Sequence, residues 1–133
     1  MTLSGKVAVV TGGGRGIGAA VARSLAEAGA SVVVAARTKA EIGSVAAQTG
    51  GWALPCDVTK PASVRKLAET VGKRLGPVQI LVNNAGIAPS SPLHKLTLAE
   101  WNRVMAVNAT GALLTIQAFL PGMLAARWGR IVN

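Results

Sequence analysis

The chain has 133 residues, half of them apolar and 14% charged, and its formal net charge is +9. This length and apolar content indicate one globular domain with its own core and exclude an intrinsically disordered chain. The positive charge invites a nucleic-acid partner, but the basic residues form no single block and no aromatic platform accompanies them. We therefore expect no nucleic-acid binding.

Cysteine content and hydropathy restrict the chain further. Cys56 is the only cysteine, so we expect it to be buried and predict neither a disulfide within the chain nor a bound metal. A single cysteine suits a reducing compartment, and residues 1–6 lack a signal-peptide pattern, so we predict a cytoplasmic location. The uncharged stretch 104–126 contains Asn108, Thr115 and Pro121. We expect there a helix covered by a sheet and by a partner, and no membrane span.

A strand, a glycine turn and a helix open the chain. Residues 6–10 predict a strand, and the run from Ala19 predicts a helix to about Ala28. Between them, glycines let backbone N–H groups approach phosphates, and the helix N-terminus adds unpaired donors and the positive end of its dipole. No Gly-Lys-Ser/Thr follows, which excludes a P-loop. We predict a cradle for a dinucleotide pyrophosphate, with cofactor contacts from Gly12, Gly14, Arg15, Gly16, Ile17 and Gly18.

Strands and helices alternate along the rest of the chain. The spacing predicts strands at 31–36, 52–55, 78–82 and 129–133, and helices from Thr38 to Gln48, from Pro61 to Gly76 and from Thr97 onward. Thr38 with Glu41, and Thr97 with Glu100, form candidate capping boxes. This order predicts an α/β fold with a doubly wound parallel sheet of the Rossmann type. We expect residues 1–133 to be one dinucleotide-binding domain, with ligands beyond the carboxyl ends of the strands.

The end of the second predicted strand indicates which dinucleotide is bound. An NAD site usually places an Asp or Glu about 20 residues beyond the glycine loop, on the ribose hydroxyls. This chain has Arg37 at that point and no acid. A guanidinium suits the additional phosphate of NADP, and Arg15 is a second candidate. We predict NADP rather than NAD, against the alternative that both arginines are ordinary surface residues.

Four ordered motifs resemble the short-chain dehydrogenase/reductase family. They are the glycine loop with Thr11, the pair Asp57-Val58, the run Asn83-Asn84-Ala85-Gly86, and the end Arg130-Ile131-Val132-Asn133, with Asn108 also matching. The resemblance covers the whole chain but only the N-terminal half to two-thirds of a typical member.

The resemblance implies a role for each matching position. Asp57 would accept a hydrogen bond from the adenine amino group, with the Val58 backbone beside it. Asn83 would brace the sheet, and Ala85 and Gly86 would line the nicotinamide ribose. Asn108 would hold a water in a proton relay, the only catalytic role among these residues. Taken singly, Asp57 reads equally well as a helix-start residue, Asn83 as part of a turn and Asn108 as a buried polar residue.

The activity that the resemblance implies needs residues that these 133 do not include. In the family a tyrosine acts as general acid, a lysine four residues later lowers its pKa, and a serine polarises the carbonyl. The chain has no tyrosine. We therefore expect an N-terminal fragment, cut after the start of the fifth strand, of an NADP-dependent oxidoreductase. We expect the fragment alone to be inactive and poorly soluble.

The complete enzyme would interconvert a small-molecule ketone, such as a 3-oxoacyl group, and a secondary alcohol. It would act as a homo-oligomer. Two other hypotheses for the function stay open. One is a nucleotide-binding module without catalysis, and the other is an interaction protein that pairs through its exposed helix. His94, in the loop before the long helix, is expected to be solvent-exposed and not catalytic.

Overall fold

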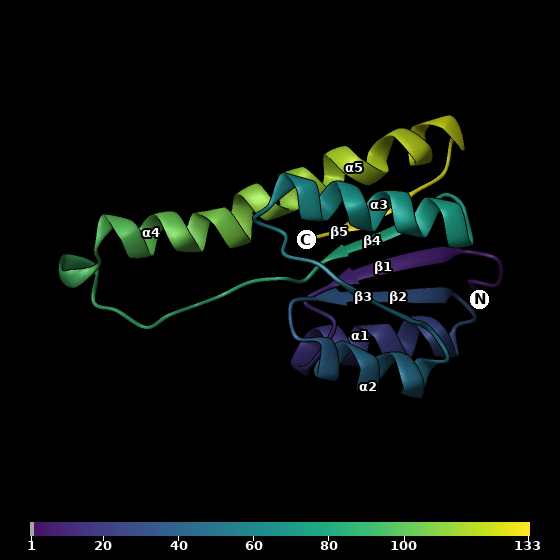
Figure 1. Cartoon of the computed structure of the whole chain (residues 1–133), viewed down its shortest axis with the longest axis horizontal. Helices are drawn as coiled ribbons and strands as arrows, with labels where there is room; N and C mark the ends of the chain where they lie inside the picture. Colours follow the sequence, from purple (N-terminus) through teal and green to yellow (C-terminus); the bar gives the residue numbers. More distant parts are fainter. Residues whose placement is uncertain (1) are drawn as a thin grey trace.

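A computed structural model of the chain describes residues 2–133 as a parallel sheet between two layers of helices (Figure 1). The five strands lie in the order β3-β2-β1-β4-β5, so the predicted Rossmann-type sheet is confirmed. Most strand and helix ends fall within two residues of the prediction. The elements are β1 (Val7–Thr11), α1 (Gly16–Glu27), β2 (Ser31–Ala36), α2 (Lys39–Thr49), β3 (Trp52–Pro55), α3 (Pro61–Leu75), β4 (Ile80–Asn83), the 3₁₀ turn η1 (Leu93–Lys95), α4 (Leu98–Met105), the π-helical segment η2 (Ala106–Thr110), α5 (Gly111–Ala125) and β5 (Arg130–Val132).

The sheet is buried on both faces, which is why its strands read as continuous apolar runs. Alternate residues of β1 point to opposite sides, Val9 toward the layer that contains α3 and α5, and Val10 toward α1 and α2. Both valines are fully buried. Figure 1 shows these helix pairs on opposite faces of the sheet. The β1–β4 pairing marks the topological switch point, because β2 leads away from β1 on one side and β4 on the other.

The charge of α3 lies on its solvent side. Val64, Leu67 and Val71 are buried against the sheet. The basic residues on the other side, Arg65, Lys66, Lys73 and Arg74, are exposed, as predicted. Four of the 14 basic residues thus lie on one solvated helix face.

The two predicted capping boxes have different outcomes. At the start of α4, the Thr97 hydroxyl accepts from the Glu100 amide and the Glu100 carboxylate accepts from the Thr97 amide, so this box is confirmed. At the start of α2 the prediction is wrong, because Thr38 makes no side-chain capping bond. The Glu41 side chain lies against the glycine loop instead, with Oε2 3.2 Å from where a Cβ on Gly14 would lie.

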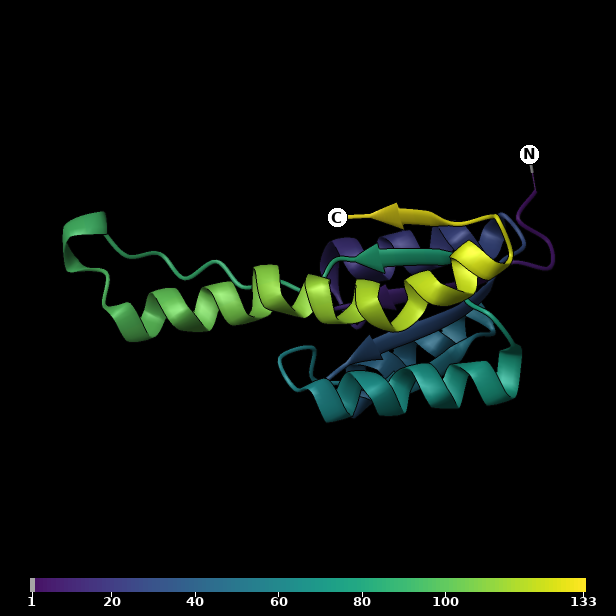
Figure 2. The same ribbon diagram turned by 90° about the horizontal axis from the view of Figure 1, so that it is seen from above.

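The continuous helical segment Leu98–Ala125, called the projecting segment below, extends beyond the sheet at its α4 end, whereas α5 lies beside the sheet (Figures 1 and 2). Its α5 part buries one stripe, which includes Thr115, Phe119 and Met123, so the predicted cover by the sheet is confirmed. The predicted cover by a partner stays a prediction. Only 17% of its most apolar 18-residue stretch is buried. Length and composition alone would let it cross a membrane, a test that core helices of soluble proteins pass as well.

Candidate functional site

A cleft of about 370 Å³ opens at the carboxyl edge of the sheet, where β1, β2 and β4 end. This is the edge at which ligands bind in doubly wound sheets. Ten of the predicted cofactor residues line it: Gly12, Gly14, Arg15, Gly16, Ile17, Arg37, Asp57, Val58, Ala85 and Gly86. The cleft walls also include residues that the sequence did not single out as ligand contacts, namely Ala35, Ala36, Thr38, Glu41, Cys56, Thr59, Asn84, Ile87 and Val107.

The glycines of the loop have different physical reasons to lack a side chain. Gly12 and Gly16 have φ of +62° and +54°, a region that other residues rarely adopt. A Cβ on Gly12 would lie 2.9 Å from the Ala85 Cα, whereas one on Gly16 would meet nothing within 4 Å. Gly18 faces away from the cleft, where a Cβ would meet the Gly12 carbonyl and the Asn84 amide. Because Gly12 and Gly18 have no side chains, the glycine loop can pack closely against the residues that follow β4. The space beside Gly16 remains open.

Side-chain hydrogen bonds join the glycine loop to the end of β4. The Asn84 amide nitrogen donates to the carbonyls of Thr11 (3.2 Å) and Gly12 (3.0 Å). The Thr11 hydroxyl accepts from the Ala85 amide at 3.1 Å and donates to the Val82 carbonyl at 3.3 Å. Thr11 is itself 1% exposed. The two walls of the cleft are thus fixed to each other before any ligand is considered.

The amino end of α1 offers the donors that a pyrophosphate needs. Arg15, with extended backbone (φ −158°), precedes the first helical residue, Gly16, and no acidic residue lies in the first turn. Backbone N–H groups at such an end lack partners within the helix, and the dipole favours an anion there. Together with the open space at Gly16, this donor set fits the phosphates of a dinucleotide.

Two arginines and one acid surround the outer end of the cleft. Arg37 follows β2 directly and Arg15 stands in the glycine loop, and both are exposed. Glu41 reaches the same wall from the first turn of α2. In residues 2–133 the sole ion pair joins Lys60 and Asp57, so neither arginine is neutralised by Glu41 within 4.0 Å. This end of the cleft therefore carries two unpaired guanidinium groups that suit a phosphate.

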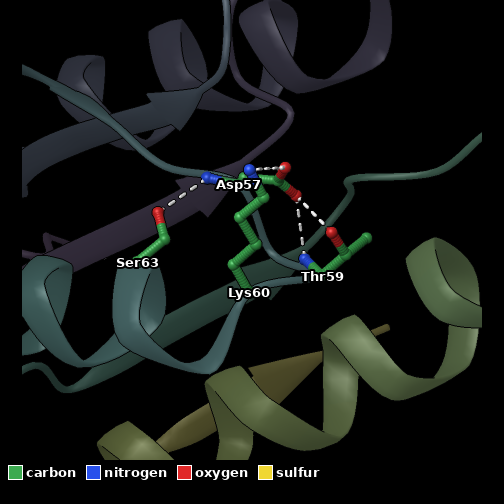
Figure 3. A network of polar contacts seen from close by, with 4 residues as sticks. All are labelled: Asp57, Thr59, Lys60 and Ser63. Carbon is green, nitrogen blue, oxygen red and sulfur yellow. Dashed lines mark hydrogen bonds and ion pairs between the residues drawn. The ribbon is translucent and has the colours of Figure 1, made fainter.

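Asp57 is held by hydrogen bonds from the residues that follow it (Figure 3). Its Oδ1 accepts from the Thr59 hydroxyl at 2.7 Å and from the Thr59 amide at 3.0 Å, and its own amide donates to Ser63 Oγ at 2.9 Å. The Thr59 hydroxyl, followed by the Thr59 amide and the charge of Lys60, holds the pKa of the Asp57 carboxyl below its ordinary value. Asp57 thus presents an ionised carboxylate to the cleft.

Cys56, beside Asp57, is buried as predicted and 3% exposed. Burial raises the pKa of its thiol, and the bond to Ser63 opposes that shift. A protonated, buried thiol is a poor nucleophile, so Cys56 acts here as a small apolar wall residue.

Asn83 and Asn108 lie outside the cleft lining but support it. Asn83 Oδ1 accepts from the Thr115 hydroxyl at 2.6 Å, and its Nδ2 donates to Asn133 Oδ1 at 2.9 Å. Asn108, in the π-helical segment η2, accepts from the Ile87 amide (2.8 Å) and donates to the Ile87 carbonyl (2.9 Å). Its side chain therefore ties the loop after β4 to the long helix. The water-holding role predicted for Asn108 stays a prediction.

His94 is exposed and belongs to η1. Figure 1 shows η1 at the end of the molecule that lies farthest from the sheet. It does not line the cleft. No group of three or more histidine, cysteine or acidic side chains that could hold a metal occurs in the described part of the chain.

Sequence and structure comparisons identify known proteins that are similar to this chain. The sequence profile of the short chain dehydrogenase family matches residues 6–133. The chain is 40% identical to D-threitol dehydrogenase from Mycolicibacterium smegmatis over 98% of its length and 52% of that protein. It is 39% identical to the 3-oxoacyl-[acyl-carrier-protein] reductase FabG from Vibrio cholerae over 100% of its length and 55% of that protein.

Among solved structures, the chain is similar to a metagenomic short-chain oxidoreductase in complex with NADP. The TM-score is 0.92 at 42% identity, and the match covers all of this chain and 63% of the other. The chain thus spans about half the length of the curated relatives it matches. With its parallel sheet, glycine loop and matching family profile, the chain belongs to the short-chain dehydrogenase/reductase family.

Proposed function

We propose that residues 1–133 form the dinucleotide-binding domain of an NADP-dependent oxidoreductase. The observation that carries this proposal is the cleft in which the glycine loop, Arg37 and Asp57 meet. Gly16 leaves room for phosphates, and the amino end of α1 supplies backbone donors. Asp57 would accept from the adenine amino group, and Ala85 and Gly86 would line the nicotinamide ribose.

The preference for NADP rests on charge at the outer end of the cleft. Arg37 stands where an NAD site has an acid, and Arg15 provides a second cation. Glu41 also lines the cleft, but it comes from α2 and not from the end of β2. The similar metagenomic oxidoreductase was solved with NADP, which supports the same assignment.

The substrate class comes from the family and its named relatives. We propose a ketone and its secondary alcohol, including a 3-oxoacyl group, with reduction as the favoured direction. NADP would carry the hydride when bound. The proton must come from an acid such as the family's tyrosine, which residues 1–133 do not contain. These residues alone should therefore bind the cofactor without turnover, and we propose a cytoplasmic location for the enzyme.

Isothermal titration of the chain with NADP and NAD tests the proposal. We expect NADP to bind more tightly, and Arg37→Asp to weaken NADP binding by about tenfold or more because a phosphate would face a carboxylate. Arg65→Asp, on the exposed side of α3, is the matched charge reversal outside the cleft and should change little. Tighter binding of NAD, or equal effects of the two reversals, would contradict the assignment.

An interaction role is the second candidate. It is favoured by apolar side chains of the projecting segment, since Leu98, Trp101, Met105 and Leu113 are 73%, 50%, 40% and 53% exposed. This surface also underlies our proposal of a homo-oligomer. Light scattering distinguishes the candidates when combined with the titration. A chain that oligomerises without binding either dinucleotide would favour the interaction role.

A further inference from the structure

The two oxygens of the Asp57 carboxylate are in different states (Figure 3). Oδ1 accepts two hydrogen bonds, both from Thr59. Within residues 2–133 Oδ2 accepts no hydrogen bond, and Lys60 Nζ lies 3.9 Å from it, which is beyond hydrogen-bond distance. The Lys60 side chain is 73% exposed and so is not held in one position, whereas that of Asp57 is 25% exposed. Oδ2 is therefore the oxygen that remains free to accept from a ligand in the cleft.

Thr59 orients the Asp57 carboxylate and also favours its ionised form. Two donors on one oxygen, at 2.7 and 3.0 Å, restrict rotation of the carboxylate plane more than one donor would. The bond from the Asp57 amide to Ser63 Oγ fixes the backbone at the same residue. The free oxygen thus has a defined position, and because the carboxylate is ionised it can only accept.

We propose that Thr59 is a positioning residue, which orients Asp57 so that the cleft accepts a purine with a 6-amino group and rejects one with a 6-oxo group. A 6-amino group donates to Oδ2, whereas a 6-oxo group would place an acceptor against an acceptor. The inference rests on the proposed function, because it assumes that the base of a dinucleotide reaches Asp57.

The same geometry predicts how the preference can be reversed. In Asp57→Asn, the two Thr59 donors favour the amide oxygen at the Oδ1 position, since an NH₂ group there would face an N–H. The amide nitrogen then occupies the Oδ2 position and turns the acceptor into a donor. The variant should therefore favour the 6-oxo base.

Two probes differ at the base alone: NADP and nicotinamide hypoxanthine dinucleotide phosphate. Isothermal titration of the 133-residue chain with both gives a ratio of affinities in which the phosphate contacts cancel. For the unaltered chain we expect NADP to bind about tenfold more tightly, the range for a hydrogen bond to a charged group. For Asp57→Asn the ratio should fall below one.

The role of Thr59 is tested by Thr59→Val, which removes the hydroxyl and keeps the shape and the backbone N–H. Alone it should reduce the preference for NADP by a few-fold. Combined with Asp57→Asn it should bring the ratio back toward one, because the amide is less firmly oriented. Thr70→Val removes a hydroxyl that bonds the Lys66 carbonyl on α3, at 2.7 Å, and should leave the ratio unchanged.

Each outcome separates this inference from the proposed function. A purely structural role of Thr59 would weaken both probes equally and leave the ratio unmoved, which would overturn the inference. Equal binding of the two probes by the unaltered chain would also overturn it while leaving NADP binding intact. Failure to bind NADP or NAD at all would overturn the proposed function and the inference with it.

Discussion

The carboxyl edge of the sheet and the projecting helical segment differ in how far their side chains are bonded to, or covered by, the rest of the chain. At the sheet edge, Thr11, Asn84 and Asp57 are each joined to neighbouring elements by hydrogen bonds. In the projecting segment, Leu98 and Trp101 are 73% and 50% exposed. The edge is a site assembled from the chain's own residues, whereas the segment presents an apolar surface to its surroundings.

This difference shows which part of the chain carries the stability and the binding chemistry. The sheet core is buried on both faces, so its side chains contribute through close packing. The outer part of the helical segment, α4, buries no residue, and the adjoining η2 is bonded to the loop after β4 through Asn108 and Ile87. Changes in the two regions should therefore have effects of very different size.

The largest contrast should come from one substitution made in each region. Leu81 is 0% exposed in β4, and Leu98 begins α4 at 73% exposure. We expect Leu81→Ala to lower the free energy of unfolding by about 2–5 kcal/mol. Leu98→Ala should change it by less than about 0.5 kcal/mol. Urea unfolding followed by circular dichroism measures both, and similar losses would mean that the projecting segment is packed as tightly as the sheet.

A second test compares two glycines in helices. A Cβ on Gly18 would meet the Gly12 carbonyl and the Asn84 amide, whereas one on Gly43 would meet nothing within 4 Å. We expect Gly18→Ala to cost about 1–3 kcal/mol and to weaken NADP binding, because the glycine loop must move away from β4. Gly43→Ala, inside α2, should stabilise the chain by about 0.5–1 kcal/mol. Thermal unfolding and titration check both expectations. If Gly18→Ala changed neither stability nor NADP binding, the glycine loop would be able to accommodate a methyl group without moving from β4.

The sequence predicted well those features that depend on local pattern. The continuous apolar run of β2 and the glycine loop followed by a helix lie where they were expected. Pro61 begins α3, as a proline suited to the first helical turn should. Each of these follows from residues close together in the chain, so the local sequence was enough to predict it.

Features that depend on contacts between distant residues were missed or wrong. Glu41 takes no part in the predicted capping box and instead lies against Gly14, which is distant in the sequence. Asn84 was noticed as part of a motif, but its bonds to the glycine loop span more than 70 positions. The signal for Thr59 was present, since a threonine two residues after an aspartate can bond its carboxylate locally.

A third test uses the two threonines that precede helices. Thr97 caps α4 through the Glu100 amide at 3.2 Å, whereas Thr38 makes no side-chain capping bond to α2. Thr97→Ala should therefore cost about 1 kcal/mol of helix stability, and Thr38→Ala only a few tenths. Hydrogen exchange of the first-turn amides of both helices measures this locally. Equal loss of protection would mean that capping does not stabilise the projecting segment.

The smallest expected effect is the pH dependence that Asp57 confers. Because the Thr59 bonds lower the pKa of Asp57 in the folded chain, the ionised carboxylate favours folding. That contribution is complete above the ordinary Asp pKa of about 3.9 and disappears as the pH falls through the lowered value. The stability difference between the unaltered chain and Asp57→Asn should therefore shrink as the pH is lowered from neutrality through this range. Thr59→Val should flatten the dependence, because the hydroxyl is the main cause of the shift. A difference that is constant with pH would show that the Thr59 bonds do not distinguish the carboxylate from the carboxylic acid.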